Sequence, residues 1–348
     1  MNRLAVLLLL GLTGLAIARI GRVKKADKDG ILDEEDNDKF ETFKGRFKRN
    51  CTDGADACKQ RKRNFANNLK RIKKFQKNNT DTKEEFGVTE FADWSTADLK
   101  KLVINPDKMP APLDSIVVPE PKRSKRATAT AFDWRTKGVV TPVKNQGQCG
   151  CCWAFAASAA VETASNIINK RYNASQRSYS EQQIMTCTQS SPCNGGWPAT
   201  ALNSIKTKGA ARTATVPYTG KETACPSVAV DMPVNTVVDM TGNVASALSF
   251  VGTTGPITAA FYVCEDFYYY TSGIYSTNCT TSSANFLGGH AVTIMGYGTN
   301  SAGVNFWLVK NSWGTNWGMA GYFQIKRGTD TCKFETWGLS APTAKVIA

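Results

Sequence analysis

Two residues of this chain, Cys152 and His290, could act together as a nucleophile and its base. A thiol attacks as its thiolate, and near neutral pH an imidazole is the side chain best suited to accept the proton. The 348 residues include a single histidine, so any cysteine–histidine chemistry must use His290. A lone histidine beside an apolar strand is more often a packing residue. Here Gly288 and Gly289 leave room beside it, and the apolar run 291–294 predicts a strand that would hold it rigidly.

Cys152 lies at the predicted start of an alanine-rich helix that continues to about Ile168. The dipole and the unpaired N–H groups of a helix N-terminus favour a thiolate, and a neighbouring imidazolium would lower the thiol pKa further. An arbitrary cysteine of a secreted chain is more often half of a disulfide. The local context therefore favours a nucleophile at Cys152 without excluding a structural cysteine.

Three motifs, in chain order, resemble those of the papain and cathepsin family of cysteine proteases. Residues 146–153, QGQCGCCW, are similar to that family's nucleophile motif, and the 138 positions from Cys152 to His290 lie within the family's spacing. Residues 311–314, NSWG, are similar to its third motif. The resemblance covers essentially the whole chain after the predicted signal peptide.

The resemblance implies the roles of the catalytic residues. Cys152 would attack the scissile carbonyl, and His290 would hold it as an ion pair and then protonate the leaving amine. Asn311 would orient the imidazole, with Trp313 screening that contact from water. Gln146 would donate its side-chain N–H, together with the backbone N–H of Cys152, to the oxyanion. No metal and no cofactor are expected.

The resemblance also implies where extended peptide and protein substrates bind. The expected substrate-binding residues are Gly195, Gly196, Trp197, Pro198, Ala260, Gly288, Trp313 and Trp337. Trp337 would lie at the base of the main specificity pocket and shorten it. We therefore predict a modest apolar residue, rather than Arg or a large aromatic, at the second position upstream of the cut. The cathepsin B-like branch blocks its cleft with a histidine-bearing loop, which this chain has no second histidine to supply. The cathepsin H-like mini-chain is also not evident, so endopeptidase action is expected.

The fold implied by the resemblance is α+β, with a helical N-terminal lobe, a β-barrel-like C-terminal lobe and the active-site cleft between them. Composition agrees, because an alanine-rich helical half precedes a half rich in β-branched and aromatic residues. A helical propeptide is expected before these lobes. Its pattern is similar to that of the cathepsin L-like branch at Arg61, Phe65, Asn68 and Ile72, although Ala57 and Gln76 depart from it. We expect this segment to lie in the cleft and to inhibit the enzyme until it is removed.

The chain is expected to divide into a signal peptide (1–18), a propeptide (19–126) and a protease domain (127–348). An early arginine, an apolar stretch and a small-x-small site are typical of a signal peptide, whereas a membrane anchor needs about twenty apolar residues. Five prolines between residues 105 and 121 precede the dibasic cluster 123–126, where processing is expected, although an ordinary basic linker is the alternative. The expected product is a monomer without a membrane segment, either secreted or in a lysosome-like compartment. Four glycosylation sequons, at Asn50, Asn78, Asn173 and Asn278, agree with the secretory route.

The chain has 11 cysteines, and an odd number leaves at least one unpaired. The resemblance implies three disulfides, Cys149–Cys193, Cys187–Cys225 and Cys279–Cys332. Cys51 and Cys58 could then pair with each other, which leaves Cys151, Cys152 and Cys264. Cys151 departs from the family, which usually has Ser or Ala there. It could form a strained bond with Cys152 or be a small buried residue, and we favour the second interpretation.

Two other classes of function are weighed against a protease. A catalytically silent homologue acting as a binding protein would usually lack the Cys, His or Asn, and all three are present. A nucleic-acid or heparin-binding protein is suggested by the net charge of +14. However, residues 1–126 carry +9 of this charge and the remainder only +5, so nucleic acid is not expected as a partner.

Overall fold

The computed structural model describes residues 29–50, 54–76, 82–104, 116–117, 130–173 and 176–347. The predicted signal peptide 1–18, the dibasic cluster 123–126 and Asn78 lie outside the described residues. Within the described part, no helix has both the length and the apolar character needed to cross a bilayer.

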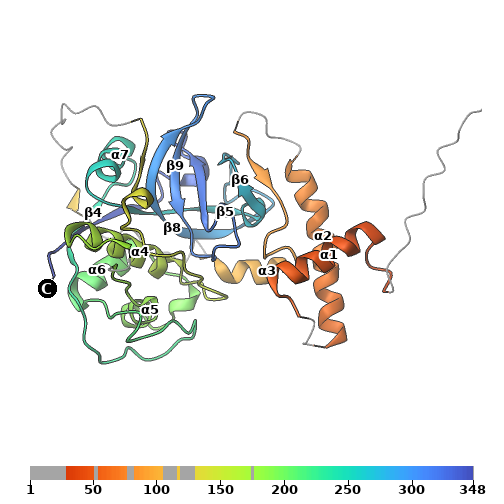
Figure 1. The fold of residues 1–348 in the computed structure, drawn as a ribbon, viewed down its shortest axis with the longest axis horizontal. Helices are drawn as coiled ribbons and strands as arrows, with labels where there is room; N and C mark the ends of the chain where they lie inside the picture. The colour runs from red at the N-terminus through yellow and green to blue at the C-terminus, as the bar shows by residue number, and fades with distance from the viewer. Residues whose placement is uncertain are drawn as a thin grey trace, which may run out of the picture.

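The residues described between 29 and 104, here called the N-terminal segment, are mainly helical, as the sequence predicts. They contain α1 (Glu34–Phe47), α2 (Ala55–Phe75), β1 (Glu85–Phe86), α3 (Thr96–Leu99) and the 3-10 turn η2 (Lys100–Leu102). The ring of Phe65 on α2 packs against Phe40 and Phe43 on α1, at centroid distances of 5.2 and 5.1 Å. Asn68 donates from α2 to the carbonyls of Ala92 and Trp94, both at 3.0 Å. Figure 1 shows α1 and α2 at one end of the molecule, beyond β5 and β6.

The helical lobe is built around α4 (Cys152–Ile168), which is buried along most of its length. Its many alanines allow neighbouring elements to approach closely, because a small side chain takes little room at a helix contact. The other helices of this lobe are α5 (Glu181–Thr188), η6 (Pro192–Asn194) and α6 (Pro198–Lys208). In Figure 1, α5 lies on the side of α4 away from β8 and β9, whereas α6 lies beside β4.

The second lobe is a mixed sheet in the hydrogen-bonded order β2-β4-β11-β5-β8-β9-β10-β7, with β3 also paired to β8. Its edge strand β2 comes from the predicted propeptide and pairs with β4. The strands are β2 (Ile116–Val117), β3 (Phe132–Asp133), β4 (Val234–Asp239), β5 (Ile257–Cys264), β7 (Ile274–Tyr275), β8 (Phe286–Thr299), β9 (Asn305–Lys310), β10 (Tyr322–Lys326) and β11 (Leu339–Ala344). The helical elements in and beside this lobe are η4 (Trp134–Lys137), α7 (Val244–Thr253), η7 (Glu265–Tyr269) and η8 (Thr331–Lys333). The predicted two-lobe α+β fold is confirmed, although the paired strands follow an open path among the described residues rather than closing into a barrel.

The N-terminal segment packs against the β-rich lobe close to the cleft. β1 pairs antiparallel with β6 (Tyr270–Ser272). Thr89 donates to the carbonyl of Tyr268 at 2.7 Å, and the Tyr268 hydroxyl donates to Leu99 at 2.8 Å. Arg71 of α2 forms an ion pair with Glu265. A strand pair, buried hydrogen bonds and an ion pair therefore hold the segment in one position.

Two of the predicted disulfides are confirmed and the third is wrong. Cys149–Cys193 and Cys187–Cys225 are present as expected. Cys279 pairs with Cys264 rather than with Cys332, which is a buried free thiol. The Cys332 sulfur lies 3.3 Å from the backbone nitrogen of Cys279, so the three cysteines form one cluster. Chain spacing could not decide which two of them pair. Cys58 is disulfide-bonded, and Cys51 lies outside the described residues.

Disulfide mapping tests this pairing. After alkylation of free thiols under denaturing acidic conditions, which suppress thiol–disulfide exchange, we expect Cys332 to be modified. Mass spectrometry of the digest should then recover a linked peptide pair containing Cys264 and Cys279. The confirmed bridge Cys149–Cys193 is the internal control. Recovery of a Cys279–Cys332 pair with alkylated Cys264 would contradict the arrangement described here.

Candidate active site

His290 lies on β8 with its imidazole in a fixed orientation. Its Nε2 is 2.7 Å from Asn311 Oδ1, and the backbone N–H of Ser312 donates to the same oxygen at 2.8 Å. Because a backbone N–H can only donate, the atom that receives it must be the amide oxygen, and Nε2 must also donate to it. Nδ1 then carries the free lone pair, and among the described residues it has no hydrogen-bond partner. The neutral histidine is therefore held in the tautomer that leaves Nδ1 available as a base.

Cys152 is the first residue of α4, and its sulfur faces the strand that carries His290. The backbone N–H of Ala291 donates to Cys152 Sγ at 3.4 Å. Register places His290 opposite Phe261 on β5, so the histidine is fixed within a strand pair. The predicted nucleophile thus contacts the backbone of Ala291, the residue next to the predicted base. This contact joins two residues that are 139 positions apart and belong to different lobes.

Both groups are held in their neutral forms. Burial raises the pKa of the Cys152 thiol to about 12, even though the N–H groups of Ala291 and Trp153 favour the thiolate. Burial lowers the pKa of His290 to about 4, against the effect of its bond to Asn311. Neither side chain has measurable exposure. Desolvation penalises the charged form of each group, so the covered site contains a thiol and an imidazole rather than an ion pair.

The end of the N-terminal segment provides this cover. Gln146 Nε2 donates to the Leu102 carbonyl at 3.0 Å. A peptide oxygen of the segment therefore accepts from the predicted oxyanion donor. Ile104 exchanges backbone hydrogen bonds of 2.7 and 2.6 Å with Gly289. A Cβ at Gly195 would lie 2.5 Å from Ile104 Cγ2, and one at Gly288 would lie 2.7 Å from the Ile104 carbonyl oxygen. The predicted blocking of the cleft is confirmed.

The predicted oxyanion donor Gln146 is fully buried and held by bonds that the motif did not reveal. Ser312 donates from its hydroxyl to Gln146 Oε1 at 2.7 Å, which directs Nε2 toward the cleft. Trp313 covers the imidazole, with ring centroids 4.7 Å apart, and is itself fully buried. The screening role expected for Trp313 agrees with this position. Ser312 lies inside the NSWG motif next to Asn311, so the sequence places it at the site. The motif does not show its hydrogen bond to Gln146.

Three of the residues predicted for the specificity pocket lie together. Trp197 and Ala260 form a small buried cluster with Ala199, and Trp337 packs against it. The Trp337 ring lies 4.6 Å from that of Tyr262 and so near Gly289 that a Cβ there would overlap it.

Gly196 was predicted for the edge that pairs with the substrate backbone, and Pro198 for the pocket. A Cβ at Gly196 would overlap the indole of Trp153, and Pro198 begins α6. Tyr262, which packs on Trp337, was missed because no local motif marks it.

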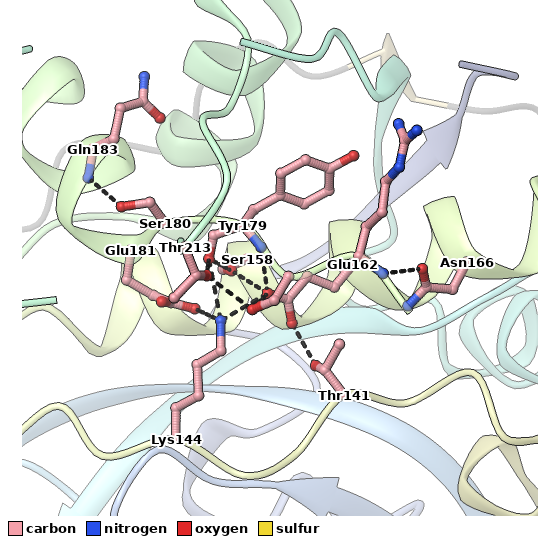
Figure 2. A network of polar contacts seen from close by, with 12 residues as sticks. Thr141, Lys144, Ser158, Glu162, Asn166, Tyr179, Ser180, Glu181, Gln183 and Thr213 are labelled. Atoms are coloured by element: carbon pink, nitrogen blue, oxygen red, sulfur yellow. Dashed lines mark hydrogen bonds and ion pairs between the residues drawn. The ribbon is translucent and has the colours of Figure 1, made fainter. Parts of the chain in front are cut away.

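A buried polar network lies behind the site (Figure 2). Lys144 donates to Glu162 at 2.7 Å and to Glu181 at 2.5 Å. Glu162 also accepts from the Tyr179 backbone at 2.7 Å and from Thr141. Lys310, which precedes Asn311, donates to the Thr141 carbonyl at 2.7 Å. Sequence reasoning missed this network, because lysines and glutamates far apart in the chain carry no sign of burial together.

The chain matches the models of two known protein families. Residues 128–341 match the model described as "Papain family cysteine protease", and residues 40–99 match "Cathepsin propeptide inhibitor domain (I29)". Pro-cathepsin H of Mus musculus is 35% identical, with 77% of this chain and 80% of that protein covered. Cysteine proteinase 3 of Solanum lycopersicum is 32% identical over 97% of this chain and 98% of its own length. The solved digestive procathepsin L2 of Tenebrio molitor is 30% identical, with a TM-score of 0.78 over 88% of this chain and 99% of that one.

The protonation of His290 can be measured directly, because it is the only histidine. In an untagged Cys152→Ala full-length chain, we expect its ring proton resonance not to titrate from about pH 8 to 5. After the N-terminal segment is removed, the midpoint should rise toward the ordinary value of about 6.5. The proton then binds the open site better than the covered one, so binding of the segment should weaken as pH falls from about 6.5 toward 4.

A Cys152→Ser chain provides the control for the loss of the sulfur. A midpoint near or above the ordinary value in the covered chain would contradict the proposed effect of burial.

Proposed function

The chain belongs to the papain family of cysteine proteases, and we propose that Cys152, His290, Asn311 and Gln146 are its catalytic residues. It is a cysteine endopeptidase made as an autoinhibited precursor. The observation that carries the residue assignment is the bond from His290 Nε2 to Asn311 Oδ1 at 2.7 Å. Because Nε2 donates in this bond, Nδ1 carries the free lone pair of the ring. His290 is the only histidine in the sequence, and it lies on the strand that faces Cys152 Sγ.

Each residue then has a defined task in peptide hydrolysis. With the cleft open, His290 takes the thiol proton, and the Cys152 thiolate attacks the scissile carbonyl carbon. The resulting oxyanion accepts from Gln146 Nε2 and from the Cys152 backbone N–H. The carbon–nitrogen bond breaks as the imidazolium protonates the leaving amine, which leaves a thioester. His290 then deprotonates a water molecule, whose attack releases the acid and restores the thiol.

We assign the enzyme to the cathepsin L-like branch. Asn68, part of the propeptide pattern, makes two buried hydrogen bonds that join α2 to the chain at Ala92 and Trp94. The single histidine leaves none for a cleft-blocking loop of the cathepsin B type. An unblocked cleft suits extended peptide and protein substrates that continue on both sides of the cut bond.

The proposed precursor has a signal peptide (1–18), an inhibitory propeptide (19–126) and a protease domain (127–348). The protease domain contains three disulfides, which form and persist in oxidising compartments. These disulfides and the signal-like N-terminus support passage through the secretory pathway to the cell exterior or a lysosome-like compartment. We propose that the processed enzyme acts as a monomer.

Labelling by an activated-thiol reagent tests the catalytic pair. After acid maturation, a peptidyl epoxide should modify Cys152 stoichiometrically, because a thiolate held by an imidazolium reacts far faster than an ordinary thiol. His290→Ala should abolish this labelling, and Tyr322→Phe, on β10, should not change it. The modified residue is identified by mass spectrometry. Absence of labelling in a reduced enzyme whose propeptide is gone would favour the catalytically silent homologue.

The role of Trp337 is tested with peptide amides that vary at the second position upstream of the cut. We expect the highest kcat/KM for a modest apolar residue, because the Trp337 ring takes up space beside Gly289. Trp337→Ala should raise kcat/KM for a large aromatic at that position by about tenfold, as expected when an apolar pocket is enlarged. The preference for residues at the first position upstream of the cut should be the same in Trp337→Ala as in the unmodified enzyme. A profile dominated by Arg in the unmodified enzyme would contradict the assignment.

A further inference from the structure

The hydroxyl of Tyr218 lies between the residue before the nucleophile and the predicted oxyanion donor. It donates to the backbone carbonyl of Gln146 at 2.6 Å, and it lies 3.1 Å from the sulfur of Cys151. The Tyr218 ring meets Phe155 on α4 edge-on, at a centroid distance of 4.9 Å, which fixes its position. Cys151 is completely buried.

The direction of these hydrogen bonds follows from what each group can donate. A carbonyl only accepts, so the single proton of the Tyr218 hydroxyl is committed to Gln146. The Tyr218 oxygen can therefore interact with Cys151 only by accepting its S–H. Cys151 must remain a thiol for the chain of contacts to persist, and burial agrees with this by raising its pKa to about 12.

The peptide group that Tyr218 holds is the one that joins Gln146 to Gly147. Its oxygen accepts from Tyr218, and its N–H donates to the Asn145 side chain at 2.9 Å. The Gln146 backbone N–H donates to the Ser312 carbonyl at 2.9 Å. The side-chain amide of Gln146 extends from a backbone held on both sides. If the Tyr218 bond were lost, this peptide group could rotate and displace Nε2.

Cys151 also occupies the N-cap position of α4 without capping it. Its side chain makes no hydrogen bond to the first turn, and its contact with Tyr218 takes its place. Ser, which is strongly preferred at N-caps, would bond readily to those N–H groups. Sulfur is a weak acceptor, so the thiol is better suited to the contact with Tyr218.

We propose that Cys151 and Tyr218 are positioning residues for catalysis, which hold the amide of Gln146 where the oxyanion forms. This inference rests on the proposed function of Gln146. It gives a role to the cysteine that departs from the family pattern, and it requires neither a disulfide with Cys152 nor a direct contact with substrate.

The test compares a reaction that forms an oxyanion with one that does not. Peptide amide hydrolysis passes through an oxyanion, whereas alkylation of Cys152 by iodoacetamide displaces iodide without forming one. In the processed enzyme, Tyr218→Phe should lower kcat by about tenfold, as a small misplacement of a catalytic group does. KM and the alkylation rate of Cys152 should stay within about twofold of the unmodified enzyme. Tyr322→Phe, the matched loss of a hydroxyl on β10, should change neither rate.

A double-mutant cycle separates positioning from general damage. Gln146→Ala should lower kcat by about 100-fold or more, and adding Tyr218→Phe should cost less than about twofold beyond that. An unchanged kcat in Tyr218→Phe, a parallel loss of alkylation, or a full tenfold loss on top of Gln146→Ala would overturn the inference. An unchanged kcat in Gln146→Ala would instead overturn the proposed oxyanion role itself.

Substitution of Cys151 gives a second measurement that does not depend on the folding of Tyr218→Phe. Cys151→Ala removes the donor but keeps the tyrosine, so we expect a smaller loss in kcat of about threefold, again with alkylation unchanged. In Cys151→Ser the hydroxyl can bond either Tyr218 or the first turn of α4, and kcat should lie between those of Cys151→Ala and the unmodified enzyme. Equal kcat in all three proteins would exclude a positioning role for Cys151.

Discussion

The placement of the proposed catalytic groups depends on one buried carboxylate, that of Glu162. It is fully buried and accepts hydrogen bonds from Lys144, Tyr179 and Thr141, among others. Burial opposes its ionisation, but the charges of Lys144 and Lys310, together with the hydrogen bonds from Lys144 and Thr141, outweigh this and lower its pKa. A buried pair contributes little net stability compared with an apolar core, whereas removing one partner costs about 3–5 kcal/mol. The network therefore matters chiefly because its members must remain together.

Three segments that carry catalytic residues meet at this network. Glu162 belongs to α4, which begins at Cys152, and Lys144 precedes Gln146 by two residues. Lys310 lies directly before Asn311 and donates to the Thr141 carbonyl at 2.7 Å. A change in any of these bonds would alter the relative position of nucleophile, oxyanion donor and histidine partner. Since the segments come from both lobes, the two sides of the cleft are fixed to each other close to the reacting atoms.

The proposed catalytic residues could be named from the sequence because each lies in a short motif whose spacing reflects a local structure. The helix start at Cys152 and the strand at His290 are such cases. Tyr218 and Glu162 could not be found this way, because their partners lie far along the chain and their immediate neighbours are ordinary. The pairing of Cys279 was predicted wrongly for a related reason. Cys264, at the end of β5, and Cys332, in η8, both lie beside Cys279, and only the packed structure distinguishes them.

Adjacent cysteines at the start of α4 have opposite requirements. Cys152 must lose its proton to react, whereas Cys151 must keep its own to donate to Tyr218. Both thiols are neutral in the covered enzyme, because burial raises the pKa of each to about 12. Removing the propeptide exposes the cleft where Cys152 and His290 meet, so the ion pair can form there. Cys151 points to Tyr218 behind the cleft, so opening the site leaves its environment unchanged. The direction of each side chain, rather than its position in the sequence, thus determines which thiol becomes the nucleophile.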